Sequence, residues 1–229
     1  MKYKTLLLDA DETLLDFCRS EGFALETTLA SHGIAMTTAI HETYHEINRL
    51  LWQQLERGEI LRERLKVQRF EELFESIGAV GINAAAFNEA YMQTLGTKGF
   101  LLDGALELVK TLSKSYRLCI VTNGTASVQH TRLADSGFLP YFEYVFISQE
   151  IGADKPSPLF FDAVMQTLGY PDKSELLIIG DSLTSDIRGG ITAGIDACWY
   201  APHGRVAPPE CLPTYTVRSY EELLSLLTV

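Results

Sequence analysis

The sequence has few cysteines, few basic residues and no long apolar run, and each shortage excludes a class of protein. Its four cysteines show no C-x-x-C spacing and no accompanying histidines, which argues against a zinc site or a disulfide framework. No apolar run is long enough to span a membrane as a helix. The 19 lysines and arginines are outnumbered by 30 aspartates and glutamates and form no basic stripe. We therefore expect neither a membrane nor a nucleic acid polymer as a partner.

The net charge of −11 still allows a small anionic ligand. A divalent cation and one lysine can make a single pocket positive inside an acidic protein. The chain has 229 residues, which suits one large domain or a core with a smaller insert. Its start, Met1-Lys2-Tyr3-Lys4, leads directly into an apolar run without room for a signal peptide, so we expect a cytoplasmic protein.

Two aspartates follow the first predicted strand, residues 3–8. Side chains alternate along a strand, so Asp9 and Asp11 are expected to lean the same way. Two carboxylates that face one small space repel each other unless a cation lies between them or one of them holds a proton. Carboxylate oxygens at this spacing suit Mg²⁺. Taken alone, the pair is equally well explained by a turn that closes the strand.

Three further predicted strands also end in polar residues. The strand at 118–121 is followed by Thr122-Asn123-Gly124, the strand at 144–147 by Lys155-Pro156, and the strand at 176–179 by Gly180-Asp181 and then Asp186. Each motif alone has an ordinary explanation as a turn or a helix start. In an open parallel sheet, however, ligands bind outside the carboxyl ends of the strands, so these residues converge on one site. Together they are the components of magnesium-assisted phosphoryl transfer.

The apolar pattern divides the chain into a helical block and an alternating block. From about residue 20 to 95 the spacing is helical, and one apolar stripe is formed by Ile40, Tyr44, Ile47, Leu51 and Leu55. A second helix is predicted over residues 61–77. After residue 98 strands and helices alternate, with further strands near 197–200 and 215–217, which is typical of an α/β protein with a parallel sheet. The helical block is therefore an insertion between the first two motifs.

The four motifs, in this order and at these strand ends, resemble the haloacid dehalogenase superfamily, specifically its phosphatases. In the resemblance the first motif holds Asp9 and Asp11, the second Thr122, the third Lys155, and the fourth Asp181 and Asp186. It implies a doubly wound parallel sheet, a Rossmann-like catalytic core made of residues 1–16 and 98–229. It also implies that residues 17–97 are an inserted α-helical cap.

The resemblance assigns the chemical steps to the first motif. It implies that Asp9 attacks phosphorus and forms an aspartyl-phosphate, and that Asp11 acts as general acid and then as general base. A superfamily member that displaces halide from carbon lacks an acid at the position of Asp11. A phosphatase is therefore favoured over a haloacid dehalogenase.

The other motifs supply the ligands of Mg²⁺ and of the phosphoryl group. Asp181 is the expected metal ligand, together with the Asp9 carboxylate and the backbone carbonyl of Asp11. Asp186 is expected not to bind the metal directly but to orient Lys155 or a metal-bound water. The phosphoryl oxygens are expected to be held by Thr122, by backbone amides near Asn123 and by Lys155.

Within the superfamily the sequence is most similar to the bacterial pyrimidine 5′-nucleotidases. The similarity is carried by residues 9–14, by Leu51-Trp52 with residues 58–60, and by residues 185–194 with Cys198-Trp199. It implies that the substrate is a nucleoside 5′-monophosphate. The alternative is a phosphatase of another small metabolite, such as phosphoglycolate or a sugar phosphate.

Other functions fit the sequence less well. A phosphomutase, a haloacid dehalogenase, a signalling receiver domain and a non-enzymatic phosphate-binding protein rank below a phosphatase. Phe17, His45 and Asn48 are candidates for contact with a nucleobase, but none of them is assigned that role, and Trp52 is better explained as a core residue. We expect a small phosphate monoester as the partner, and a monomer or a weak homo-oligomer.

Overall fold

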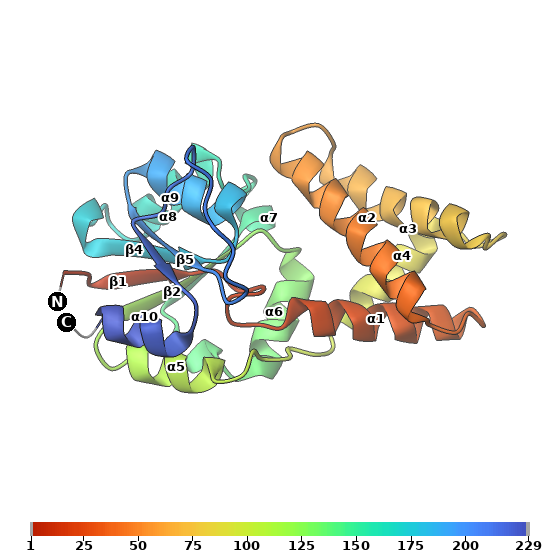
Figure 1. Ribbon diagram of the computed structural model, residues 1–229, viewed down its shortest axis with the longest axis horizontal. Helices are drawn as coiled ribbons and strands as arrows, with labels where there is room; N and C mark the ends of the chain where they lie inside the picture. The colour runs from red at the N-terminus through yellow and green to blue at the C-terminus, as the bar shows by residue number, and fades with distance from the viewer. Residues whose placement is uncertain (1, 228–229) are drawn as a thin grey trace. The chain divides into compact units, whose positions relative to one another are not determined.

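The computed structural model describes residues 2–227, and its larger part is built around a parallel sheet (Figure 1). Six strands within these residues form the sheet, and their spatial order is β3 (Tyr144–Ile147), β2 (Arg117–Thr122), β1 (Thr5–Leu8), β4 (Leu176–Gly180), β5 (Asp196–Tyr200), β6 (Tyr215–Val217). All neighbouring pairs are parallel. The chain proceeds outward from β1 in both directions, which confirms the predicted doubly wound fold.

Helices cover both faces of this sheet. One face carries α5 (Ala105–Leu112) and α10 (Tyr220–Leu227), and the other carries α8 (Pro158–Thr167) and α9 (Arg188–Ala193). The remaining helical elements of this part are α6 (Ala126–Ser136), a 3₁₀ turn (Leu139–Tyr141), α7 (Ser148–Ile151), a second 3₁₀ turn (Lys173–Glu175) and the π-helical turn η3 (Leu183–Ile187). In β1, Leu6 and Leu8 pack into one hydrophobic cluster and Leu7 into the other. A strand buried on both faces is continuously apolar, which explains the sequence of β1.

Two glycines bring α9 close to the sheet. A Cβ atom at Gly190 would lie 2.5 Å from Cγ2 of Ile178 in β4, and one at Gly189 would lie 2.5 Å from the ring of Phe161 in α8. These distances are too short for real contacts, so a larger residue would push the helix away. Gly189 and Gly190 therefore let α9 pack closely against α8 and against the sheet.

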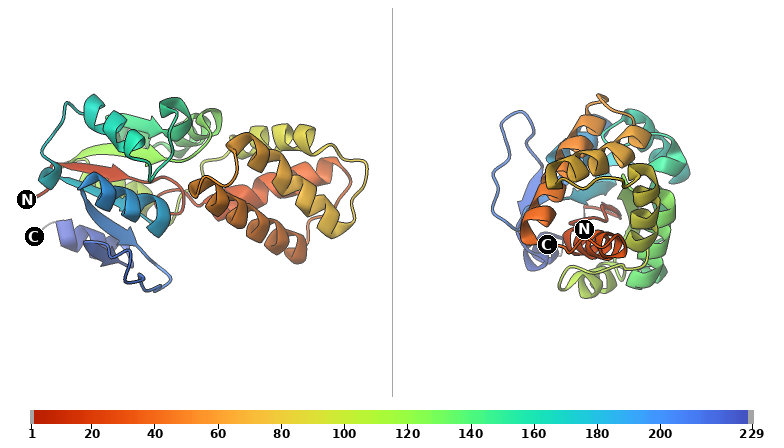
Figure 2. Two further views of the ribbon diagram at one scale, coloured as in Figure 1. Left: turned by 90° about the horizontal axis from the view of Figure 1, so that it is seen from above. Right: turned by 90° about the vertical axis from the view of Figure 1, so that its right-hand side faces the viewer.

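A second compact unit is entirely helical. Contacts divide the chain into Met1–Phe17 with Gly99–Val229, here called the core unit, and Cys18–Lys98, here called the helical unit. The helical unit is formed by α1 (Phe17–Ser31), α2 (Thr38–Glu56), α3 (Arg62–Ile77) and α4 (Ala84–Leu95) (Figure 2). Its interior contains an aromatic cluster of Tyr44, Phe70, Phe74, Phe87 and Tyr91. That this unit acts as a cap stays a prediction.

A buried polar network also connects the helices of this unit. Glu21 is fully buried, and its carboxylate accepts a hydrogen bond of 2.7 Å from Nδ2 of Asn48 and lies 2.9 Å from Nδ1 of His45. Oδ1 of Asn48 accepts from Arg69 at 3.2 Å, and the same guanidinium donates to Asn88 at 2.7 Å. The Asn48 side chain therefore connects the buried carboxylate of Glu21 to the buried guanidinium of Arg69.

The structure changes the interpretation of the residues that were candidates for contact with a nucleobase. Asn48 is buried and both ends of its amide are used inside the helical unit, so it is a structural residue. Trp52 is only half-buried and lies under the guanidinium of Arg62, 5.2 Å from its ring, so it is not the core residue that its spacing suggests. Phe17 belongs to the core unit, where the guanidinium of Arg132 lies 5.4 Å from its ring.

We predict that Asn48→Leu destabilises the protein by on the order of 3 kcal/mol, because it leaves two buried charged groups without the hydrogen bonds that Asn48 supplies. The free energy of unfolding can be measured by urea denaturation followed by circular dichroism. The neighbouring change Arg49→Leu affects an exposed side chain paired with Glu46 and is the control, with a cost below about 0.5 kcal/mol. Equal losses in the two variants would contradict the structural role of Asn48.

Candidate active site

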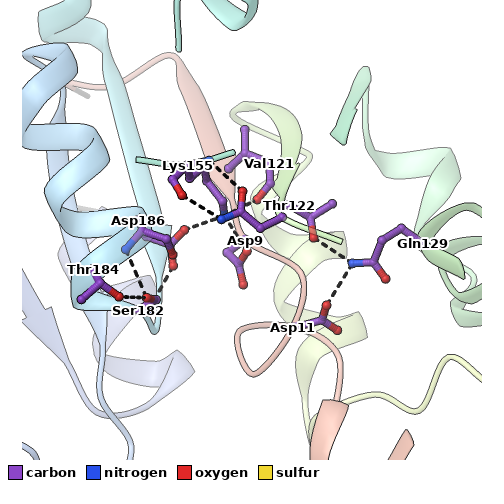
Figure 3. Close-up of polar contacts among 11 residues, drawn as sticks. Asp9, Asp11, Val121, Thr122, Gln129, Lys155, Ser182, Thr184 and Asp186 are labelled. Atoms are coloured by element: carbon purple, nitrogen blue, oxygen red, sulfur yellow. Dashed lines mark hydrogen bonds and ion pairs between the residues drawn. The ribbon is translucent and has the colours of Figure 1, made fainter. Parts of the chain in front are cut away.

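The polar residues that follow the strands lie together at one edge of the sheet (Figure 3). Asp9 follows β1, Thr122 is the last residue of β2, and Asp181 follows β4. These are the three central strands, at the point where the strand order reverses. A ligand site is expected at this point of a doubly wound sheet.

Lys155 lies at the centre of the group and is almost completely buried. Its ammonium donates to Oδ1 of Asp9 at 2.7 Å, to Oδ1 of Asp186 at 2.6 Å and to the carbonyl of Val121 at 2.7 Å. All three ammonium hydrogens are thus used. Burial lowers the pKa of Lys155, but the two carboxylates outweigh this effect and the net shift is upward. The lysine is therefore a fixed positive charge.

The backbone of Lys155 is held by Asn123. Oδ1 of Asn123 accepts from the amide of Lys155 at 2.7 Å, and Nδ2 donates to the carbonyl of Lys155 at 2.8 Å. Both ends of this side chain are thus occupied by a peptide unit of the chain. The side chain of Asn123 therefore positions Lys155. The binding of phosphate by Asn123 and the backbone amides near it stays a prediction.

Asp186 is positioned by the turn that follows β4. The residue lies in the π-helical turn η3, and its Oδ2 accepts from the backbone amide of Ser182 at 3.1 Å. A Cβ atom at Gly180 would lie 2.2 Å from Oδ2 of Asp186, so only glycine fits at the end of β4. The contact of Asp186 with Lys155 agrees with the predicted orienting role.

Three carboxylates gather around this lysine. Among the described residues, Asp9, Asp181 and Asp186 each offer one oxygen, and these oxygens lie within 4.8 Å of one another. Burial raises the pKa of Asp9 to about 7, Lys155 counteracts the shift, and the charges of Asp186 and Asp11 add to it. Burial, followed by the charges of Asp9 and Asp186, raises the pKa of Asp181 well above its usual range. Lys155 pairs with Asp9 and Asp186, whereas Asp181 lies 3.9 Å from the guanidinium of Arg205. A further cation among the three acids would lower their repulsion.

Asp11 has different partners from Asp9. Its Oδ1 accepts from Nη1 of Arg132 at 2.6 Å, and its Oδ2 accepts from Nε2 of Gln129 at 3.0 Å. The same nitrogen of Gln129 donates to Oγ1 of Thr122 at 2.8 Å. The sequence suggested that both aspartates face one small space. The structure gives the two carboxylates different hydrogen-bond partners, Lys155 for Asp9 and two side chains of α6 for Asp11, while the charge of Asp11 still raises the pKa of Asp9.

Sequence reasoning did not identify Gln129 and Arg132. Both side chains are about 1% exposed, which is unusual for such polar residues. The sequence contains a pattern that could have identified them. Gln129 and Arg132 are three positions apart and lie next to the apolar residues Val128 and Leu133, so in a helix they fall on or beside its apolar face. Polar residues on the apolar side of a helix that follows a site motif are candidates for contact with that site.

Comparisons with known proteins identify the class of enzyme to which this site belongs. A family model described as haloacid dehalogenase-like hydrolase matches residues 3–194. YfnB of Bacillus subtilis, described as a HAD-hydrolase, is 37% identical and the match covers 100% of this chain and 97% of YfnB. The crystal structure of YfnB, which is bound to magnesium, superposes with a TM-score of 0.95. The chain belongs to the haloacid dehalogenase-like hydrolases.

Two further relatives are named for a substrate. Pyrimidine 5′-nucleotidase PynA of Streptococcus pneumoniae is 40% identical, and the match covers 99% of this chain and 96% of PynA. Pyrimidine 5′-nucleotidase YjjG of Escherichia coli is 34% identical, with 99% of each chain covered. The predicted membership of this superfamily and the predicted enzyme class are thus confirmed. In the part of the chain that the structure describes, no helix is long and apolar enough to cross a membrane.

Proposed function

We propose that the protein is a magnesium-dependent phosphomonoester hydrolase that acts on pyrimidine nucleoside 5′-monophosphates through an aspartyl-phosphate. The observation that carries the substrate class is the full-length similarity to two enzymes named pyrimidine 5′-nucleotidase. The reaction is supported by the geometry around Asp9, a buried carboxylate beside a buried lysine and two further acids.

The carboxylates fit a magnesium ion by their chemistry. Mg²⁺ prefers hard oxygen ligands. Asp9 is buried and Asp181 is partly buried, and both pKa values are raised, first by burial and then by the charges of neighbouring carboxylates. Both oxygens of Asp186 already accept hydrogen bonds, Oδ1 from Lys155 and Oδ2 from the amide of Ser182, whereas only Oδ1 of Asp9 accepts one from Lys155. We therefore propose Asp9 and Asp181 as the direct ligands, with the carbonyl of Asp11 beside them. When bound, the ion would neutralise the phosphate and the nucleophile together.

In the first step, Asp9 attacks the phosphorus of the substrate. Lys155 donates to Oδ1, so we assign the attack to Oδ2. The bond from phosphorus to the leaving oxygen breaks, and Asp11 transfers a proton to that oxygen. An alcohol leaves and an aspartyl-phosphate remains on Asp9. The hydroxyl of Thr122 and the charge of Lys155 stabilise the phosphoryl oxygens.

In the second step, water regenerates the enzyme. The Asp11 carboxylate takes a proton from the water as its oxygen attacks phosphorus, and the bond from phosphorus to Asp9 breaks. Inorganic phosphate is released, Asp9 is again a carboxylate, and Asp11 again holds a proton. A halide can leave carbon without a proton, whereas an alkoxide leaves poorly, so the position of Asp11 favours phosphate esters over haloacids.

We predict that Asp9→Asn abolishes turnover without unfolding the protein, because the amide keeps the size but cannot attack phosphorus. Asp11→Asn is expected to lower kcat/KM by on the order of 10² to 10⁴ for an alkyl phosphate and by less for p-nitrophenyl phosphate, whose leaving group needs no proton. The control is Asp162→Asn, an exposed position in α8. Released phosphate measures the rates, and turnover by Asp9→Asn at the rate of the unaltered enzyme would refute the mechanism.

We predict that Mg²⁺ raises the melting temperature of the unaltered protein, since a ligand that binds the folded state stabilises it. Asp181→Asn is expected to abolish most of this rise. In chelator the same variant should melt no lower than the unaltered protein, because it removes a buried negative charge next to two others. Asp162→Asn should keep the full response. A magnesium response that survives Asp181→Asn would place the metal elsewhere.

We predict that pyrimidine nucleoside 5′-monophosphates have a higher kcat/KM than purine nucleotides, phosphoglycolate or hexose phosphates. In the proposed mechanism the named side chains of the core unit act on the phosphoryl group and on the leaving oxygen. Selection of the base therefore needs other side chains, and we propose that the helical unit supplies them. A phosphate-release screen over these compounds tests the ranking. A preference for phosphoglycolate or a hexose phosphate over every pyrimidine nucleotide would exclude the nucleotidase assignment but keep the phosphatase.

A further inference from the structure

Gln129 and Arg132 form a buried polar pair that none of the proposed chemical steps uses. Both belong to α6, and each side chain is about 1% exposed. Their partners are the side chains of Asp11 and Thr122, which come from two different strand ends. The pair therefore connects the proposed general acid to the proposed phosphate-binding hydroxyl.

The orientation of the Gln129 amide follows from its neighbours. Oε1 accepts from Nη1 of Arg132 at 2.9 Å, and Nε2 donates to Oδ2 of Asp11 at 3.0 Å and to Oγ1 of Thr122 at 2.8 Å. The flipped amide would turn its oxygen toward a carboxylate and its NH₂ group toward a guanidinium. Both contacts would be repulsive, so only the first orientation is compatible with the site.

This orientation determines what Thr122 can do. Its hydroxyl oxygen accepts a hydrogen from Gln129, which is its hydrogen-bond partner among residues 2–227. The hydrogen of the hydroxyl is not used in that bond, so it is available for an acceptor in the site. A phosphoryl oxygen is such an acceptor. Gln129 thereby converts a group that can donate or accept into a donor aimed at phosphate.

Asp11 is held at both of its oxygens. Arg132 binds Oδ1 with a charge-assisted hydrogen bond of 2.6 Å, and Gln129 binds Oδ2. The Asp11 side chain is 28% exposed although both of its donors are buried. The two buried donors therefore hold the carboxyl group while part of it stays accessible. Proton transfer to a leaving group requires such a fixed direction.

The surrounding backbone is shaped to admit Gln129. A Cβ atom at Gly124 would lie 2.3 Å from Cγ and 2.8 Å from Nε2 of Gln129. Glycine at this position lets the side chain lie across the turn that follows β2. The glycine of the Thr122-Asn123-Gly124 motif is therefore explained by the same contact.

We propose that Gln129 and Arg132 are positioning residues for the reaction, a role that rests on the proposed phosphatase function. Arg132 acts through Asp11 and affects departure of the leaving group. Gln129 acts through Asp11 and through Thr122, so it affects both departure of the leaving group and binding of the phosphoryl group. Neither residue touches the reacting atoms.

The test compares two esters by kcat/KM, which reports the steps up to departure of the leaving group and omits hydrolysis of the aspartyl-phosphate. Arg132→Lys is expected to lower kcat/KM at least tenfold for an alkyl phosphate and less than threefold for p-nitrophenyl phosphate. Gln129→Met is expected to lower both values, and the alkyl value more. The control is His130→Ala, an exposed position of α6 paired with Glu150, which should change neither.

Double variants separate positioning from a general structural effect. In the Asp11→Asn background, Arg132→Lys should cost less than threefold on either ester. In the Thr122→Val background, Gln129→Met should cost less than threefold on p-nitrophenyl phosphate. Losses that multiply in both backgrounds, or equal losses on the two esters in the single variants, would overturn the proposal. If the unaltered enzyme hydrolyses none of the esters with Mg²⁺, the proposed function fails instead.

A second measurement leaves Gln129 and Arg132 unchanged. The side-chain amide of Gln129 gives its own ¹H–¹⁵N signals in an NMR spectrum of the full chain. Asp11→Asn and Thr122→Val should each shift these signals and speed exchange of the amide hydrogens, and His130→Ala should leave them unchanged. Signals of Gln129 that respond to neither site variant would show that the bonds are not made, and the proposal would be wrong.

Discussion

The buried ammonium of Lys155 is the interaction on which the rest of the site depends. It binds Asp9 from β1, the carbonyl of Val121 in β2 and Asp186 after β4, and so connects three strands at their carboxyl ends. Without a cation, acids at this edge would be desolvated and would repel one another. Asn123 fixes the lysine's own backbone, so the charge cannot move away from the carboxylates. A fixed cation between acids would allow the proposed nucleophile and the proposed metal site to lie close together.

The same arrangement explains why the site is built on the central strands. Parallel strands bring their carboxyl ends to one edge, and the reversal of order at β1 leaves room there for loops from both sides. Two glycine positions then let side chains approach the backbone closely, since Asp186 lies against Gly180 and Gln129 lies against Gly124. The sheet supplies the position of each group, and these turns supply its direction.

Sequence reasoning located the side chains that lie together at the strand ends, and their roles in a reaction stay predictions. Asp181 and Thr122 could be located because each comes at the end of an apolar strand, and Lys155 because it lies in the segment between β3 and α8; the topology brings these segments together. Sequence reasoning failed where the partner is distant in the chain. Arg132 contacts an aspartate 121 residues away, and Glu21 contacts an asparagine 27 residues away in another helix. The spacing of apolar residues predicts which face of a helix is buried. It does not predict which distant residue will form a hydrogen bond with a polar side chain on that face.

The two aspartates of the first motif show how neighbours in sequence acquire different chemistry. Asp9 lies among carboxylates and one lysine, where burial raises its pKa to about 7 and where a metal would restore the charged nucleophile. Asp11, two residues later, lies against the guanidinium and the amide of α6. A carboxylate nucleophile needs positive charges fixed beside it. A carboxyl group that acts as general acid and general base needs to be held so that it faces the leaving oxygen. The different roles proposed for the two aspartates therefore rest on their different partners and not on the strand that precedes them both.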